Sequence, residues 1–379
     1  MSTLVVVICG NLLPGVKDED NPFAYLRDER SQDVVMYVAR NMPPHDKLYS
    51  EFGDAGRRID NLFRVGALRQ EGGRVLLNFT LFTREDHRIL YDVAGRYAHE
   101  LARALARHER EIRDLVGAYR RTGVSLEKVA FVAVGCFLLD WGSLEKLSEW
   151  GYMCRVRQQT GGTFTVTAEE TLDLDLRAIY WGGHSEDYDG LLFLSFGDHA
   201  SRPRRAFPDI LWQDPFRVAT DYDSPEARAV LSAYLQPLKA GLAQALRSLA
   251  GEEVNLSPHQ EACKRWLQRL GYARDGVLSV PYFDVEDRTW LEPLSRLVFS
   301  EVRAWCEEYY AKLKEALADS TPVRHGVDYR EVFRQVWHWV FGIANRSLAE
   351  RALIWDTYEA GSRTPGYLPA AATQETLRL

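Results

Sequence analysis

The sequence lacks the short motifs that mark most enzymes. Its 379 residues contain no Cys-x-x-Cys pair, no Gly-x-Ser-x-Gly nucleophile turn, no His-Glu-x-x-His metal motif and no glycine-rich phosphate loop after a strand. Apolar runs are also short, and none approaches the roughly 20 residues that a membrane-spanning helix requires. These absences give no support to enzyme activity, leave any cofactor unknown and predict a protein without a membrane partner.

The five cysteines are scattered along the chain and form no cluster. Free thiols of this kind are typical of a reducing compartment, so the sequence predicts a cytoplasmic protein without a zinc site. The apolar run from Leu4 to Cys9 is short and lacks a basic flank, which favours a β-strand over a signal peptide. We expect this strand either to join a central sheet or to cross to a second subunit.

The charge of the chain argues at first against nucleic-acid binding, because the net charge is −7. Binding depends on a local patch, however, whereas net charge averages over the whole chain. Residues 56–74 hold five arginines against Asp60 and Glu71, and residues 259–274 hold four basic residues against Glu261. Two segments are therefore locally basic within an acidic protein, unless they are simply solvated helix faces.

The strongest local pattern lies between residues 54 and 90. Apolar residues recur at helical spacing from Ile59 to Val65, and Gly66 then suits a left-handed helix end. A charged turn containing Gly72-Gly73 follows, and apolar residues alternate from Val75 to Leu81 as in a half-buried strand. The pattern predicts a helix, a tight turn and a β-hairpin.

Two further helices are predicted before this unit, at Ser31–Met42 and His45–Phe52. Three helices followed by a two-stranded wing resemble the winged helix-turn-helix superfamily over residues 31–83. Residues 258–285 resemble the last helix and wing of a second copy. The resemblance implies a third helix that enters the major groove of DNA and a wing that contacts the backbone, although winged helices also serve as protein-interaction modules.

The second copy belongs to a longer internal duplication. Leu62 and Gly66 match Leu267 and Gly271, and both wings precede long amphipathic helices, predicted over residues 85–121 and 286–318. Each long helix is followed by a break and then by an apolar helix of the buried type. The buried helices are predicted at Val129–Leu139 and around Val336–Phe341.

The predicted fold is mostly α with small antiparallel β elements (α+β), with tandem winged-helix units, long amphipathic helices and a small central sheet. That sheet uses strands Thr163–Thr167, Leu176–Trp181 and Leu191–Phe196, the last two joined by a polar loop over residues 182–190. From about Thr364 the tail has little periodicity, so we expect it to be frayed or extended. The predicted segments are residues 1–30 (strand and loop), 31–83 (winged helix 1), 84–154 (long helix and buried core helix), 155–222 (small β-sheet module), 223–285 (degenerate winged helix 2) and 286–379 (long helix, buried core helix and tail).

The leading functional prediction is a transcriptional regulator that binds double-stranded DNA. Arginine pairs well with guanine, and asparagine or glutamine with adenine, so the two helix faces carry suitable residue types. In the first unit the predicted DNA-binding residues are Arg57, Arg58, Asn61 and Arg64, with Arg69 and Arg74 on phosphates. In the second unit they are His259, Lys264, Arg265, Gln268 and Arg269, with Arg274 near the shortened wing.

Two other sites compete with this interpretation. A pocket for a small-molecule effector is predicted where the buried helices meet, lined by Trp141, Trp337, His338 and Trp339. A divalent metal or an acid–base pair is predicted at the acidic loop, from His184, Glu186, Asp187, Asp189, Asp198 and His199. The alternatives are therefore a protein-interaction scaffold, in which the long helices form a homodimer, and an enzyme or metal-binding protein that uses the acidic loop.

Overall fold

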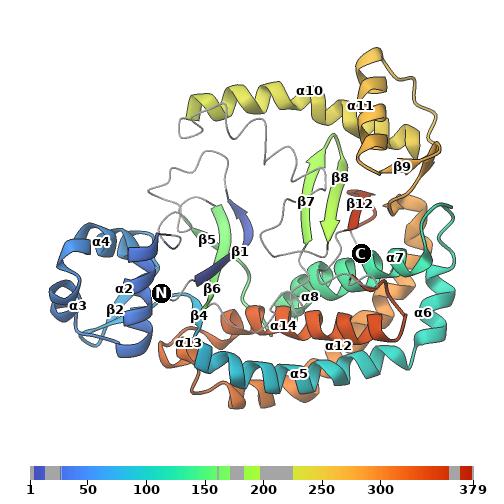
Figure 1. Cartoon of the computed structure of the whole chain (residues 1–379). Coiled ribbons are helices and arrows are strands. Elements are labelled where there is room, and N and C mark those ends of the chain that lie inside the picture. Colours follow the sequence, from blue (N-terminus) through green and yellow to red (C-terminus); the bar gives the residue numbers. More distant parts are fainter. Residues whose placement is uncertain are drawn as a thin grey trace. The chain divides into compact units, whose positions relative to one another are not determined.

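The computed structural model describes residues 4–12, 26, 28–159, 162–170, 183–196, 225–357 and 368–377. The chain is mostly helical with small sheets, which confirms the predicted fold class (Figure 1). It divides into two compact units. Unit 1 comprises Met1–Tyr97, Leu147–Asp175 and Cys306–Trp339, and unit 2 comprises Ala98–Lys146, Leu176–Trp305 and Val340–Leu379.

Unit 1 begins with three helices that surround one apolar core. Its first elements are α2 (Glu29–Asn41), α3 (His45–Glu51), α4 (Gly56–Arg64), β2 (Leu68–Glu71) and β3 (Arg74–Leu77). Val34, Ile59, Leu62 and Val75 are fully buried in this core. Strands β2 and β3 form an antiparallel hairpin, and a bridge from Pro44 to Arg74 ties the hairpin to the loop before α3. The predicted order of three helices and a hairpin is present.

The sheet of unit 1 is built on β6 (Gly162–Glu170). Strand β1 (Leu4–Leu12) runs antiparallel to it from Leu4↔Glu170 to Leu12↔Gly162, so the N-terminal strand joins a sheet of its own chain, as one of the two alternatives predicted. Strand β5 (Arg157–Gln159) also pairs with β6. The predicted continuous strand up to Leu81 was wrong, because the hairpin ends at Leu77 and β4 (Thr80–Phe82) pairs parallel with β6.

Unit 2 has a second small sheet, in the order β11-β12-β8-β7. Its strands are β7 (Gly183–Tyr188), β8 (Leu191–Phe196), β11 (Tyr282–Phe283) and β12 (Leu368–Thr373). Three predictions were wrong here. The strands predicted at 163–167 and 191–196 do not share one sheet, because β6 belongs to the sheet of unit 1 and β8 to this one. The polar segment 183–188 is a strand whose turn is only Asp189-Gly190, both at positive φ, and the tail contributes β12, which is paired on both sides. The proposed strand Leu176–Trp181 lies outside the described residues.

Two helices and a shorter hairpin pack on this second sheet. They are α10 (Pro225–Leu249), α11 (Pro258–Arg269), β9 (Ala273–Arg274) and β10 (Val277–Leu278). Leu246, Leu267 and Leu278 are buried there with Phe193 of β8. A hairpin of two-residue strands agrees with the predicted shortening of the second wing.

The long helices differ in detail from their predictions. The first is broken at Arg107 and His108 into α5 (Arg84–Ala106) and α6 (Glu109–Val116), and the His108 side chain at this break lies 3.0 Å from Glu301. The second is α12 (Arg288–Ala316), followed by the short α13 (Thr321–Arg324). The buried helices are α7 (Leu126–Ala130), which continues as a π-helix over Phe131–Gly142, and α14 (Tyr329–Glu350). The expected burial is confirmed, since almost every side chain of Phe131–Gly142 is buried. The π-helical hydrogen bonding of this segment was not predicted.

Candidate nucleic-acid interface

The exposed face of α4 carries most of the predicted contacts of unit 1. Ile59 and Leu62 are fully buried, and this fixes the rotation of the helix. Arg57, Arg58 and Arg64 therefore lie on the exposed side, while Asn61 is half-buried. The amphipathic spacing placed these residues correctly, because a helix that buries one stripe must expose the opposite one.

Internal contacts already occupy part of this face. The Arg58 guanidinium lies 2.8 Å from the Asp28 carboxylate, and Asp28 also caps α2 by accepting from the Ser31 backbone N–H. This pairing with Arg58 and the Ser31 amide lowers the pKa of Asp28, although partial burial opposes the shift. Arg57, in contrast, forms no ion pair within the part of the chain that the structure describes.

The hairpin of unit 1 has one exposed and one anchored arginine. Arg74 lies exposed beside the glycine turn. Arg69 donates a hydrogen bond of 2.6 Å to the His325 carbonyl oxygen and pairs with Glu71. The structure therefore differs from the prediction that Arg69 contacts phosphate, because its guanidinium holds the hairpin to the protein itself.

The equivalent face of unit 2 is formed by α11. Its start is fixed by a capping box, in which Ser257 and Gln260 satisfy each other's backbone N–H groups. Cys263 and Leu267 are buried, so Arg265, Gln268 and Arg269 are exposed.

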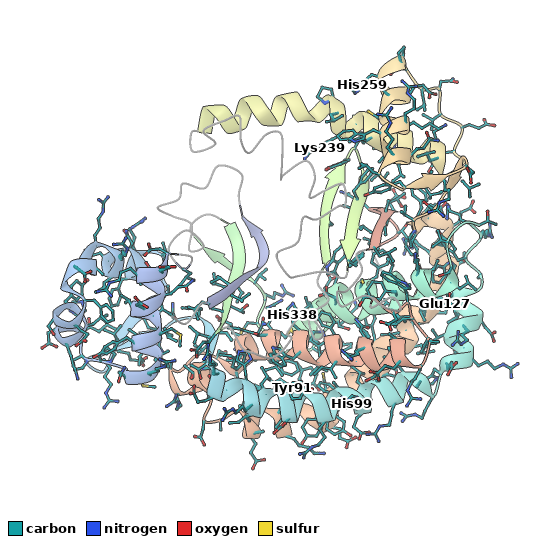
Figure 2. All side chains as sticks on the ribbon, viewed as in Figure 1. Tyr91, His99, Glu127, Lys239, His259 and His338 are labelled. Atoms are coloured by element: carbon teal, nitrogen blue, oxygen red, sulfur yellow. The ribbon has the colours of Figure 1, made fainter. Side chains whose placement is uncertain are left out.

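The basic residues of α11 fall into two groups. Lys264 donates to the Ser248 hydroxyl at 3.0 Å, and His259 packs between Cys263 and Gly241 where α11 meets α10 (Figure 2). These two residues therefore support the helix pair. Arg265, Arg269 and the hairpin residue Arg274 are exposed and form no ion pair within the described residues. Their positive charge remains available to a partner.

The tryptophans predicted to line a common pocket are divided between the two units. Trp141 belongs to unit 2 and packs on Phe196 at a ring distance of 5.2 Å. Trp337 and Trp339 belong to unit 1 and are fully buried. His338 is half-buried, its Nδ1 lies 2.7 Å from the Arg334 carbonyl oxygen, and burial lowers its pKa to about 4. The structure therefore gives these side chains packing roles within separate units.

The acidic segment is arranged differently from the predicted metal loop. Asp187 accepts from the Gly190 backbone N–H and from Gln374, and Asp189 accepts from Gln244 at 3.3 Å. Positions 184 and 186 lie within strand β7, while Asp198 and His199 lie outside the described residues. Among the side chains that are described, no group of three His, Cys, Asp or Glu could hold a metal ion.

Unit 1 contains a buried polar cluster that was not predicted from the sequence. The Glu169 carboxylate accepts from Gln335 at 2.6 Å and from the Trp339 indole at 3.0 Å. His87 lies 3.9 Å from the same carboxylate, is fully buried, and has a lowered pKa because burial disfavours its charged form. The adjacent Glu170 binds Arg40 at 3.0 Å. Two adjacent glutamates at the end of a strand rich in threonine and apolar residues were the available signal for this cluster.

A second missed group is Asp140, near the end of the π-helix. The residue is only 4% exposed, and its carboxyl group accepts no hydrogen bond within the described part of the chain. Burial raises its pKa to about 8. The signal in the sequence was a lone carboxylate in a strongly apolar run.

Comparison with known proteins gives no relative for this arrangement. No protein-family model, curated protein or solved structure matches the chain significantly. Among the described residues, no helix is both long enough and apolar enough to cross a bilayer.

Proposed function

We propose that the protein is a transcriptional regulator that binds double-stranded DNA through the exposed faces of α4 and α11 and their hairpins. The observation that carries the proposal is the unpaired charge on α11 and β9. Arg265, Arg269 and Arg274 are exposed and form no ion pair within the described residues, although the chain as a whole is acidic. Guanidinium groups in this state can neutralise phosphates or pair with guanine.

The two faces contribute unequally in this proposal. On α4, Arg58 is held by Asp28, and on the first hairpin Arg69 is held by His325 and Glu71. An arginine that must break an internal ion pair or hydrogen bond to bind phosphate gives up the free energy of that contact. Its net contribution to DNA affinity is therefore smaller. The α11 face therefore supplies most of the affinity, and the α4 face adds Arg57 and Arg74.

The test is binding of the purified protein to mixed duplex DNA across a salt series. We expect log affinity to fall linearly with log salt, with a slope of about −0.9 for each phosphate neutralised. The double variant Arg265→Ala/Arg269→Ala should weaken binding more than Arg57→Ala/Arg64→Ala and should flatten the slope by about two phosphates.

A matched control is Arg110→Ala, since the Arg110 side chain on α6 is 97% exposed and lies in neither face. This change should leave both affinity and slope unchanged. Absence of binding by the unaltered protein at low salt would refute the proposal, and the two faces would then be examined as protein-interaction surfaces.

A further inference from the structure

His325 links three parts of unit 1 that lie far apart in the sequence. It caps α13 and is fully buried. Its Nδ1 lies 3.0 Å from the backbone nitrogen of Leu77, the last residue of the hairpin, and its Nε2 lies 3.0 Å from the carbonyl oxygen of Ala39 in the last turn of α2. Its own carbonyl oxygen accepts from Arg69 of β2.

The partners fix the protonation state of this imidazole. The Leu77 N–H can only donate, so Nδ1 must be an unprotonated acceptor. The Ala39 carbonyl can only accept, so Nε2 must carry the hydrogen. Only the neutral ring with its proton on Nε2 satisfies both bonds. A second proton, on Nδ1, would point at the Leu77 N–H and leave that buried donor without a partner.

We propose that neutral His325 is a positioning residue for the DNA-binding face of unit 1, where it fixes the hairpin against α2. This inference rests on the proposed function. Helix α2 shares its core with α4, so the bond from Leu77 to His325 sets the direction in which Arg74 projects relative to Arg57 and Arg64. Protonation of His325 releases the base of the hairpin.

The charged groups around the ring oppose its protonation. Arg69 from β2 and the neighbouring Arg324 both disfavour a positive ring, whereas Asp86 from α5 favours it more weakly. Burial is the largest influence, and together with the two arginines it outweighs the hydrogen bond to Ala39 and the Asp86 carboxylate, so the pKa of His325 is lowered below its ordinary value of 6.5. The hairpin is therefore held at neutral pH and is released only in acid.

Two substitutions separate the two hydrogen bonds. In His325→Asn the side-chain oxygen can occupy the place of Nδ1 and accept from Leu77, but nothing titrates. In His325→Gln the side-chain nitrogen can occupy the place of Nε2 and donate to Ala39, but Leu77 loses its acceptor. The readouts are the hydrogen-exchange protection factor of the Leu77 amide and the DNA affinity, both measured from pH 7.5 to pH 5.

The unaltered protein should lose Leu77 protection as the pH falls through the lowered pKa of His325, by about tenfold for one lost buried hydrogen bond. His325→Asn should keep its protection at every pH, and His325→Gln should lack it at every pH. DNA affinity should change in the same way: it should fall in acid for the unaltered protein, stay unchanged with pH for His325→Asn, and be low at every pH for His325→Gln. His99→Gln is the control, because His99 is an exposed histidine of unit 2 that bonds Ser347 (Figure 2), and its removal should leave the Leu77 profile unchanged.

The outcomes separate this inference from the proposed function. If protection of Leu77 does not fall while His325 titrates in the unaltered protein, the anchor is refuted, and this holds even if neither variant folds. If DNA binds but its affinity is the same for His325→Gln and the unaltered protein, the positioning role is refuted while the proposed function stands. If protection responds as expected but no DNA binds, the proposed function fails and takes the positioning role with it.

Discussion

Replacing Asp140 by Asn should stabilise unit 2 at neutral pH and leave it unchanged in acid. Asp140 is 4% exposed, and burial raises the pKa of its carboxyl group to about 8. In the unfolded chain the same group has an ordinary pKa near 3.8. Folding at pH 7 therefore requires the carboxyl to take up a proton that the solvent provides only at a cost. The amide of Asn has nearly the same shape and carries no such cost.

The size of this effect follows from the two pKa values. A pH of 7 lies about three units above the pKa of the carboxyl in the unfolded chain, and each unit corresponds to 1.36 kcal/mol. The free-energy cost of protonating Asp140 on folding is therefore on the order of 4 kcal/mol. The folded pKa is the higher one, so stability is lost as pH rises from about 4 to about 8. The difference in unfolding free energy between Asp140→Asn and the unaltered protein should grow by about 1.4 kcal/mol per pH unit across this window.

The assay is urea unfolding of both proteins at pH 4.5, 6 and 7.5. The control is Asp114→Asn on α6. The Asp114 carboxylate is exposed and lies 3.9 Å from Arg110, so the unfolding free energy of this variant should differ from that of the unaltered protein by nearly zero at every pH. Effects of other titrating groups cancel because only differences between variants are compared. A difference for Asp140→Asn that does not change with pH would refute the argument that Asp140 is folded in its neutral form.

Two further changes test the packing that supports the faces. Ser257→Ala removes the capping box of α11 and should cost about 1 kcal/mol by thermal unfolding, and an unchanged melting temperature would show that the cap does not start this helix. Trp339→Phe removes the indole donor to Glu169 and should cost about 1–3 kcal/mol, whereas a cost near zero would mean that the remaining partners satisfy the carboxylate.

Local sequence patterns predicted the helices well, because the residues that define a helix lie close together in the sequence. Helical spacing of apolar residues located α2, α3 and α4, and Ser257 marked the start of α11. The failures concern contacts between distant segments. Strand β12 is rich in alanine and shows no alternation, because the consecutive residues Ala370, Ala371 and Ala372 are buried on both faces of the sheet. The partner of β4 lies about ninety residues away on β6.

The candidate interface was predictable in the same limited sense. Amphipathic spacing identified which arginines of α4 and α11 are exposed. It could not show which of them are already paired, because Arg58 meets Asp28 and Arg69 meets His325 only after folding. Burial of Asp140 and His87 was equally hidden, since a carboxylate or an imidazole in an apolar run is also compatible with an exposed position.

Each of the two units is built from segments of both halves of the sequence. The hairpin of unit 1 is anchored by His325, which follows the second long helix. In unit 2, Arg121 follows the first long helix and binds the Tyr282 carbonyl oxygen, Asp284 and Asp287, which lie in and just after β11. Each half of the sequence thus supplies contacts to the segment around the hairpin of the other half. Neither half contains all the residues of either unit, so a single hairpin with its helix is not an independent module. Under the proposed function, the arrangement makes binding at each face depend on folding of the whole chain.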